Sequence, residues 1–266
     1  AHNPVYQQWC KYVKGSPDQV KALEDIPFLP IDFFKQEQLS IFKSKAPLYF
    51  RSSGTGGYGQ SKHAAYDPDF YDLRTQRIFE ASYGPIQGLC VLALLPAYLE
   101  REGSSLVRMA QHFINLSSDL DSGFYLHDLK ALAEKLSSKQ AEGKKVLLLG
   151  VSFALWDLAE QFPQDLSGQI IMETGGMKGR RKELIRSDLH QIFKDAFQVE
   201  AIHSEYGMTE LLSQGYSVKN GVFKNPPWMK VFTYELNNPF KRTSKGKVGR
   251  LNIIDLANQD SCSFIS

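Results

Sequence analysis

Apolar and polar positions alternate in a way that predicts strands and helices in turn along most of the chain. The apolar runs Gly88–Leu95 and Lys145–Leu149 have the length of buried strands. Shorter strands are expected at Leu48–Phe50, Gln169–Met172 and Gln198–His203. Because helical patterns lie between most of these segments, the sequence predicts a mostly parallel sheet covered by helices.

Four helices are expected between these strands. One begins after Asp67-Pro68, because Asp caps helices and Pro is tolerated at the first helical position. A second covers Phe153–Gln161. Two more follow from apolar residues spaced to lie on one helix face: Leu129, Leu132, Ala133 and Leu136 in one, and Ile185, Leu189, Ile192, Phe193 and Ala196 in the other.

The C-terminal part of the chain has a different pattern. Val231–Leu236 and Arg250–Leu256 are typical of strands, and the turns between them are rich in Pro, Gly and Lys. The expected fold class is α/β, with mostly parallel sheets covered by helices and a smaller β-rich C-terminal part. The approximate boundaries are 1–145 and 146–220 for the α/β lobes and 221–266 for the β-rich part.

Composition excludes several classes of protein. Hydrophobic residues make up 42% and charged residues 23% of the 266 residues, as in folded globular proteins. The 31 Lys and Arg residues nearly balance the 29 Asp and Glu residues, which argues against a nucleic-acid binder. No apolar run reaches the roughly 18 residues of a membrane span, and no signal-peptide pattern is visible. The three distant cysteines form neither a disulfide framework nor a zinc motif, so a cytoplasmic protein is expected.

A loop rich in glycine and hydroxyl groups follows the first predicted strand. Residues 51–63 read Arg-Ser-Ser-Gly-Thr-Gly-Gly-Tyr-Gly-Gln-Ser-Lys-His. The glycines let the backbone turn its N–H groups toward one point, while Ser52, Ser53 and Thr55 add hydroxyl donors and Lys62 adds a positive charge. This is the chemistry that binds a polyphosphate.

Three other interpretations of this loop stay open. Gly54-x-Gly56-x-x-Gly59 matches the dinucleotide fingerprint, although that motif is normally followed at once by a helix. Gly54 and Gly59 also have the spacing of a Walker A loop, but Gln60 stands where that loop requires Lys. A flexible surface loop is the third alternative. The hydroxyl groups and the nearby Lys62 favour a nucleotide-phosphate loop of another type.

A second group of polar residues follows a later predicted strand. In Glu205-Tyr206-Gly207-Met208-Thr209-Glu210, the Tyr ring can stack on a base, the Thr hydroxyl can reach a phosphate and the last Glu can bind Mg²⁺. Gly175-Gly176 lies on another loop after another strand. Loops of this kind gather at the ligand crevice of an open α/β sheet. An ordinary polar connection from strand to helix is the alternative.

Together, the two motifs resemble those of the adenylate-forming superfamily, which includes acyl-CoA synthetases, adenylation domains of peptide synthetases and luciferases. Ser52-Ser-Gly-Thr-Gly-Gly57 is similar to the phosphate loop of that superfamily, and Tyr206-Gly-Met-Thr-Glu210 matches its Tyr-Gly-x-Thr-Glu motif. The segments Glu173–Gly179 and Asp260–Ile265 resemble most closely the acyl-protein synthetase of bacterial bioluminescence and the phenylacetate-CoA ligases. The resemblance covers essentially the whole chain.

The resemblance implies that a fatty or aryl acid is activated by ATP through an acyl-adenylate and passed to a thiol. The thiol belongs to coenzyme A, a carrier or an enzyme cysteine, and a reductase or transferase is an expected partner. Lys62, Thr209 and Glu210 are the candidate catalytic residues, with Thr209 at the α-phosphate and Glu210 on Mg²⁺. The implied cofactor-binding residues are Ser52, Ser53, Gly54, Thr55, Gly56 and Gly57 for the phosphates, Gly175, Gly176 and Tyr206 for adenine, and the adjoining Gly207 and Met208.

The sequence departs from the family pattern in three places. Gly56 stands where the loop normally has a second hydroxyl, and the Pro that usually precedes the lysine is absent. The resemblance also implies a small C-terminal lid domain with a catalytic lysine, and that domain lies outside these 266 residues. A non-catalytic nucleotide-binding module without a lid is therefore one alternative.

A serine hydrolase is another alternative. Gly150-Val-Ser152-Phe-Ala154 lies between a predicted strand and helix, like the nucleophile elbow of hydrolases, and Asp188 and His203 follow in the required order. His203 is otherwise structural or lines the ligand site. The basic group Lys178, Arg180, Arg181 and Lys182 is either a solvated face or a site for a phosphorylated thiol carrier. Cys262 is expected to be a small buried residue.

Overall fold

A computed structural model describes residues 3–36, 39–52, 59–96, 103–126, 128–175, 177, 181–244 and 246–266. The described residues divide into two compact units. Unit 1 consists of Ala1–Tyr71, Met208–Ser213 and Asn225–Ser266, and unit 2 consists of Asp72–Gly207 and Gln214–Lys224.

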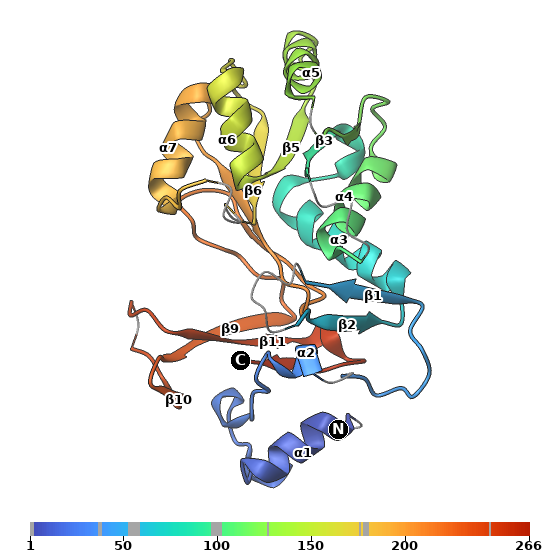
Figure 1. Ribbon diagram of the computed structural model, residues 1–266, viewed down its shortest axis with the longest axis vertical. Coiled ribbons are helices and arrows are strands. Elements are labelled where there is room, and N and C mark those ends of the chain that lie inside the picture. The colour runs from blue at the N-terminus through green and yellow to red at the C-terminus, as the bar shows by residue number, and fades with distance from the viewer. Residues whose placement is uncertain are drawn as a thin grey trace. The chain divides into compact units, whose positions relative to one another are not determined.

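Unit 2 is built around a sheet whose described strands have the order β4-β3-β5-β6-β7-β8 (Figure 1). The strands are β3 (Cys90–Leu94), β4 (Gly123–Phe124), β5 (Val146–Val151), β6 (Ile170–Thr174), β7 (His203–Tyr206) and β8 (Gly215–Ser217). Neighbouring strands are parallel except for β7 and β8, which are antiparallel. Every residue of β3, β5 and β6 is buried, as expected of parallel strands covered on both faces.

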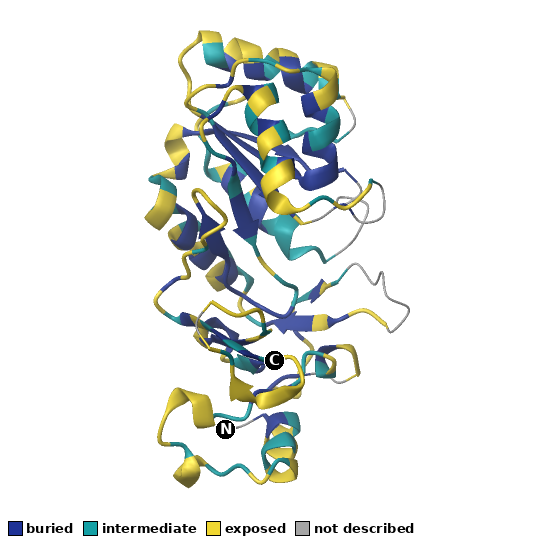
Figure 2. Cartoon of the chain, turned by 90° about the vertical axis from the view of Figure 1, so that its left-hand side faces the viewer, coloured by how far each residue is buried: buried dark blue, intermediate teal, exposed yellow. Residues whose placement is uncertain are grey.

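Helices cover this sheet on both faces, which confirms the predicted α/β fold class. α6 and α7 pack side by side on one face, and α3 and α4 lie on the other (Figure 1). Figure 2 shows the strands as buried and the outward helix faces as exposed. The helices are α3 (Pro68–Tyr83), whose first turn belongs to unit 1, α4 (Ser105–Leu116), α5 (Leu129–Ala141), α6 (Ser152–Gln161), α7 (Arg186–Phe197) and the 3-10 turn η3 (Ile86–Gly88).

The predicted helices are confirmed, with one correction. The Asp67 carboxylate accepts a hydrogen bond from the Phe70 N–H at 2.8 Å, which is the expected cap of α3. In α5, the apolar residues Leu132, Ala133 and Leu136 are buried as predicted. The placement of Ile185 on the buried face of α7 is wrong, because Ile185 precedes the helix and is 68% exposed. The buried positions of α7 are Leu189, Phe193 and Phe197, spaced by four residues.

The strand predictions are confirmed for β3 and β5 and need correction at β6 and β7. β6 extends through Glu173 and Thr174, which were expected in a loop. The strand expected at Gln198–His203 is wrong, since Gln198 ends α7 with a φ of +52° and pairing with β6 begins at His203. Glu205 and Tyr206 therefore belong to β7 itself instead of following it.

Unit 1 contains antiparallel strands, which confirms the β-rich C-terminal part. A two-stranded sheet pairs β1 (Leu48–Arg51) with β2 (Lys62–Ala65). A second sheet has the strand order β10-β9-β11-β12 among the described residues. These strands are β9 (Met229–Glu235), β10 (Asn238–Arg242), β11 (Arg250–Asp255) and β12 (Phe264–Ile265). The helices of unit 1 are α1 (Pro4–Tyr12), α2 (Phe33–Gln36), η1 (Pro17–Gln19), η2 (Leu23–Asp25) and η4 (Leu256–Asn258).

The core of unit 1 joins segments that are far apart in the sequence. One apolar cluster contains Phe50, Ala65, Tyr71, Leu212 and Ala257, so all three stretches of unit 1 contribute to it. Burial of these side chains holds the short segment Met208–Ser213 in unit 1. None of the helices in the described part of the chain is both long and apolar enough to cross a membrane.

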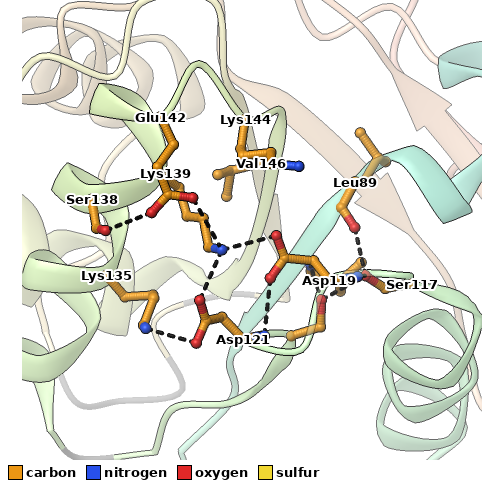
Figure 3. Close-up of polar contacts among 12 residues, drawn as sticks. Leu89, Ser117, Asp119, Asp121, Lys135, Ser138, Lys139, Glu142, Lys144 and Val146 are labelled. Carbon is orange, nitrogen blue, oxygen red and sulfur yellow. Dashed lines mark hydrogen bonds and ion pairs between the residues drawn. The ribbon is translucent and has the colours of Figure 1, made fainter.

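An ion-pair network holds α5 of unit 2 to the loop between α4 and β4 (Figure 3). The Lys139 Nζ lies 2.9 Å from Asp119 and 2.8 Å from Asp121, and the Lys135 Nζ lies 2.7 Å from Asp121. Lys139 is only 5% exposed. Burial raises the pKa of Asp119, but hydrogen bonds from Lys139 and from the Asp121 amide outweigh it and leave this pKa below its usual value. Hydrogen bonds from Lys135 and Lys139 lower the pKa of Asp121.

Replacing Lys139 with Met should destabilise the protein by about 2 kcal/mol at pH 7, because Asp119 would stay charged without its cation. Both carboxyl pKa values are lowered by folding. The stability that they contribute is therefore present above about pH 4 and is lost as the pH falls further. Chemical denaturation at pH 7 and pH 3 measures this effect, and the difference between wild type and variant should narrow at pH 3. Lys135→Met is the matched control, and an equal loss in both variants would contradict the role of Lys139.

Candidate functional site

The first predicted motif forms the connection between β1 and β2. The Ser52 N–H donates to the Ser61 carbonyl at 3.1 Å, and the Ser61 N–H donates to the Ser52 Oγ at 2.9 Å, which closes the base of the loop. Lys62 begins β2, is exposed and lies with its Nζ 4.1 Å from the centre of the Tyr49 ring. Five candidate phosphate-binding residues lie outside the described residues, and their role stays a prediction: Ser53, Gly54, Thr55, Gly56 and Gly57.

His63 joins this motif to the second one within unit 1. Its imidazole is only 1% exposed. Nδ1 lies 3.0 Å from the Thr209 carbonyl oxygen and must donate to it, because a carbonyl only accepts. Nε2 lies 2.7 Å from the Ser261 Oγ. His63 is the second residue of β2 and pairs with Phe50 of β1. The sequence alone assigned it no role, because its contact with Thr209 joins residues 146 positions apart.

The backbone around Thr209 and Glu210 is fixed by further buried hydrogen bonds. The Asn258 side-chain amide donates to the Glu210 carbonyl at 2.7 Å. The Leu212 N–H lies 3.1 Å from the Asp255 Oδ2 and 3.0 Å from the Asn258 Oδ1. Asp255 and Asn258 are both fully buried. The β-rich part of unit 1 thus sets the course of the chain through the second motif.

Glu210 is a largely buried residue, and none of the described residues pairs with its carboxylate. It is 6% exposed, and no hydrogen bond or ion pair joins its carboxylate to another described residue. A carboxylate without a partner among the described residues can offer its oxygens to a cation. The described residues contain no group of three or more His, Cys, Asp or Glu side chains that could hold a metal ion. A cation at Glu210 would therefore take its other ligands from substrate and water, as Mg²⁺ commonly does.

In unit 2, Glu173 at the end of β6 is the centre of a second polar cluster. Its carboxylate accepts hydrogen bonds from the Ser152 Oγ at 2.8 Å and the Ser204 Oγ at 3.0 Å. The His190 Nε2 lies at 3.4 Å and the Arg186 Nε at 3.2 Å. Burial raises the pKa of Glu173, but the contacts with His190 and Ser152 and the charge of Arg186 outweigh it, so the pKa lies below its usual value.

Glu205, on β7, has its pKa shifted in the opposite direction, upward. Successive side chains of a strand point to opposite faces of the sheet, so Glu205 shares a face with Thr174, whose hydroxyl donates to it. Burial raises the pKa of Glu205 to about 7, with a contribution from the negative charge of Glu173 and opposed by the bond from Thr174. A Cβ on Gly207 would lie 2.6 Å from the Glu205 Oε1, so a side chain at position 207 would have to displace the Glu205 carboxyl.

The candidate adenine residues are also in unit 2. Gly175 adopts a φ of +71°, which favours glycine, and its carbonyl lies 3.4 Å from the Ser152 Oγ. Gly176 is outside the described residues. The half-buried Tyr206 ring meets the Phe223 ring edge-on, with 6.0 Å between centres. Gly207 ends this stretch of unit 2 and Met208 begins the next stretch of unit 1.

The geometry does not favour a serine hydrolase. The Ser152 hydroxyl donates to the Glu173 carboxylate, and in the described part of the chain no histidine is hydrogen-bonded to it. His203 instead lies with its Nδ1 3.3 Å from the Tyr83 hydroxyl, and burial, with the charge of Lys145, lowers the pKa of His203 to about 4. Asp188 lies 3.3 Å from the Ser187 Oγ. The three residues do not form a triad.

The contacts of Arg181 and the burial of Cys262 bear on two further interpretations of the sequence, the basic group at 178–182 and the role of Cys262. Arg181 is paired with Asp157 and Glu160 and lies over the Trp156 ring, so its charge is compensated. Lys178 and Arg180 lie outside the described residues. Cys262 is 3% exposed, and burial raises the pKa of its thiol to about 12. It is a buried structural residue, as expected.

No protein-family model matches this chain, and no curated protein matches it. Among solved structures, 2-hydroxyisobutyryl-CoA ligase in its postadenylation state, in complex with R3-HIB-AMP, matches 100% of this chain and 58% of its own chain, with a TM-score of 0.64 and 13% identity. Coronafacic acid ligase from Pectobacterium brasiliense matches 71% of this chain and 35% of its own, with a TM-score of 0.46 and 16% identity. An amide bond synthetase from Marinactinospora thermotolerans matches 81% and 41%, with a TM-score of 0.48 and 15% identity.

Replacing Glu205 with Gln should change how stability depends on pH. The pKa of Glu205 is raised in the folded protein, so its protonated form is favoured there, and wild-type stability falls as the pH rises from about 4 to about 7. Gln keeps an acceptor for Thr174 and cannot ionise. The variant should match the wild type near pH 4.5 and be more stable by about 2 kcal/mol at pH 7.5.

Denaturant titrations at pH 4.5, 5.5, 6.5 and 7.5 measure this difference. Glu183→Gln, which removes an exposed carboxylate of the same unit, is the matched control and should follow the wild type. A Glu205→Gln variant that is less stable than the wild type at every pH would show that Glu205 is buried in its charged form.

Proposed function

The chain has the fold of the adenylate-forming ligases, and on this premise we propose that it activates a carboxylic acid with ATP. The proposed product is an acyl-adenylate of a fatty or aryl acid, which then reacts with the thiol of coenzyme A, a carrier or an enzyme cysteine. The acyl-protein synthetase and phenylacetate-CoA ligase branch is the proposed position within the superfamily. This chain spans 58% of the ligase with which it shares its fold, so the complete reaction is proposed for the whole protein.

The observation that carries the proposal is Glu210, which is 6% exposed and whose carboxylate has no partner among the described residues. Its backbone is held by Asn258 and that of Thr209 by His63, so the main chain of the motif is fixed. We propose that Glu210 binds Mg²⁺. When bound, Mg²⁺ would neutralise charge on the triphosphate and favour pyrophosphate as a leaving group.

The chain's other proposed roles concern the phosphates. The base of the Ser52–Gly57 loop is closed by Ser52 and Ser61, and we propose that the loop amides and hydroxyls hold the β- and γ-phosphates, with Lys62 nearby. The His63 contact lies next to Lys62 and fixes the carbonyl of Thr209. The Thr209 hydroxyl, for which the described residues provide no hydrogen-bond partner, would donate to the α-phosphate.

The proposed adenine residues are Gly175, Gly176 and Tyr206, and the adjoining Gly207 and Met208 are proposed as cofactor-binding residues. In unit 2, the Tyr206 ring is held edge-on by Phe223, and the residue is partly exposed. A side chain at position 207 would displace the Glu205 carboxyl, and Gly175 takes a conformation that favours glycine. These constraints support a fixed shape for the two turns beside a base.

The proposed chemistry needs no nucleophilic side chain from the protein. A carboxylate oxygen of the acid forms a bond to the α-phosphorus of ATP as the bond from that phosphorus to the bridging oxygen breaks, which releases pyrophosphate. A thiolate sulfur then attacks the acyl carbon and AMP leaves. The protein's contribution is to position the reactants and to place donors where negative charge develops.

Carboxylate-dependent exchange of labelled pyrophosphate into ATP tests the proposal. The whole protein should catalyse exchange with one class among short, long-chain and aromatic acids, and Glu210→Gln should reduce the rate by about 100-fold, because a charged ligand of the cation is lost. Glu134→Gln removes an exposed carboxylate on α5 and should leave the rate unchanged.

Two other outcomes separate the alternative functions. Ser152→Ala should retain exchange, whereas its loss together with esterase activity in the wild type would support a hydrolase. Binding of ATP without exchange for any acid would contradict the ligase and support a nucleotide-binding module.

A further inference from the structure

Unit 2 contains a groove that no predicted site residue lines. Its volume is about 560 Å³, within the range of small-molecule sites. One wall is a face of α7, and the others are residues 200–202, which precede β7, and the turn 219–221, which follows β8. All of these residues belong to unit 2.

The groove carries an excess of positive charge. Arg186, Lys194 and Lys219 line it together with one carboxylate, that of Glu200. The Lys194 Nζ has a long contact of 3.4 Å to the Gln191 side chain, and neither lysine forms an ion pair with a described carboxylate. The first turn of α7 also lines the groove and has no side-chain cap, so the positive end of the helix dipole adds to the potential.

Arg186 is held in place while its charged end stays available. Its Nε lies 3.2 Å from the Glu173 carboxylate, and its guanidinium carbon lies 5.3 Å from the centre of the Phe223 ring. Its Cδ is 4.0 Å from the position that a Cβ on Gly221 would take. The side chain is nevertheless 47% exposed, and its terminal nitrogens have no hydrogen-bond partner among the described residues. A fixed guanidinium with free N–H groups is the preferred partner of a phosphate or carboxylate.

We propose that this groove binds a small phosphomonoester that also carries hydroxyl groups. Arg186, Lys194 and Lys219 hold its phosphate, and Glu200 accepts a hydrogen bond from a hydroxyl group of the ligand. The size of the groove and the three cations that line it fit one phosphate group on a sugar-sized or nucleotide-sized molecule.

The surroundings favour a small ligand over an acidic protein. α7 also presents the exposed carboxylates of Asp188 and Asp195, which would repel an acidic protein surface laid along the helix. A small phosphate inside the groove meets the three cations instead. The proposal is independent of the proposed ligase function, because none of the predicted ATP or Mg²⁺ residues lines the groove.

Titration of the ¹⁵N-labelled protein with inorganic phosphate and with ribose 5-phosphate, each against sodium chloride of equal ionic strength, tests the site. Amide shifts at Ser187, Asn220 and Gly221 should change and saturate, with tighter binding of ribose 5-phosphate than of inorganic phosphate. Lys194→Gln and Lys219→Gln should each weaken binding about tenfold, because each removes a charge-assisted hydrogen bond. Both lysines lack ion pairs with described residues, so these variants should fold normally.

Two controls isolate the groove. Lys130→Gln removes a similar positive charge from α5, and Glu210→Gln alters the proposed Mg²⁺ ligand; neither should change phosphate binding. Shifts that do not saturate, or that weaken equally in Lys130→Gln, would overturn the proposal. So would saturable shifts with a Glu-rich peptide but none with either phosphate, which would assign the groove to a protein partner.

Discussion

The buried imidazole of His63 is the contact on which the second motif of unit 1 depends. The segment Met208–Ser213 leaves and re-enters unit 2 in the sequence, yet it belongs to unit 1. His63 holds it at Thr209, Asn258 holds it at Glu210, and Asp255 meets it at Leu212. Each of these partners is buried, so the hydrogen bonds do not compete with water, and losing one would leave a polar group unsatisfied. The position of Glu210 follows from this network.

Unit 2 also buries polar side chains, the carboxyl groups of Glu173 and Glu205, near the ends of two strands. Glu173 and Glu205 lie on neighbouring parallel strands but on opposite faces of the sheet. Glu173 meets two hydroxyls, a histidine and an arginine and stays ionised. Glu205 meets a single hydroxyl, so burial decides its protonation. Two acids of the same kind thus acquire different charges from their contacts, and both lie beside turns that contain predicted adenine residues.

Two arginines, Arg181 before α7 and Arg186 at its start, also differ in how far neighbouring carboxylates compensate their charge. Arg181 resembles Arg186 in the sequence, but its charge is taken up by Asp157 and Glu160. Arg186 has one carboxylate partner and keeps its terminal nitrogens free among the described residues, in a groove shared with two lysines. The sequence around Arg181 and Arg186 does not show which of them is paired, because the acidic partners of Arg181 come from a different helix, α6.

The sequence by itself determined the alternation of strands and helices, the fully buried strands β3 and β5, the cap of α3 by Asp67 and the two motifs that suggested a nucleotide. These features depend on residues close together in the chain, where periodicity and capping act. Tertiary structure alone decided where β7 begins, since that depends on pairing with β6, and why Ile185 is exposed. It also decided that His63 meets Thr209, that the Glu210 carboxylate has no partner among the described residues and that unit 1 is assembled from three segments. Those outcomes rest on hydrogen bonds and packing between residues up to two hundred positions apart, which local patterns do not encode.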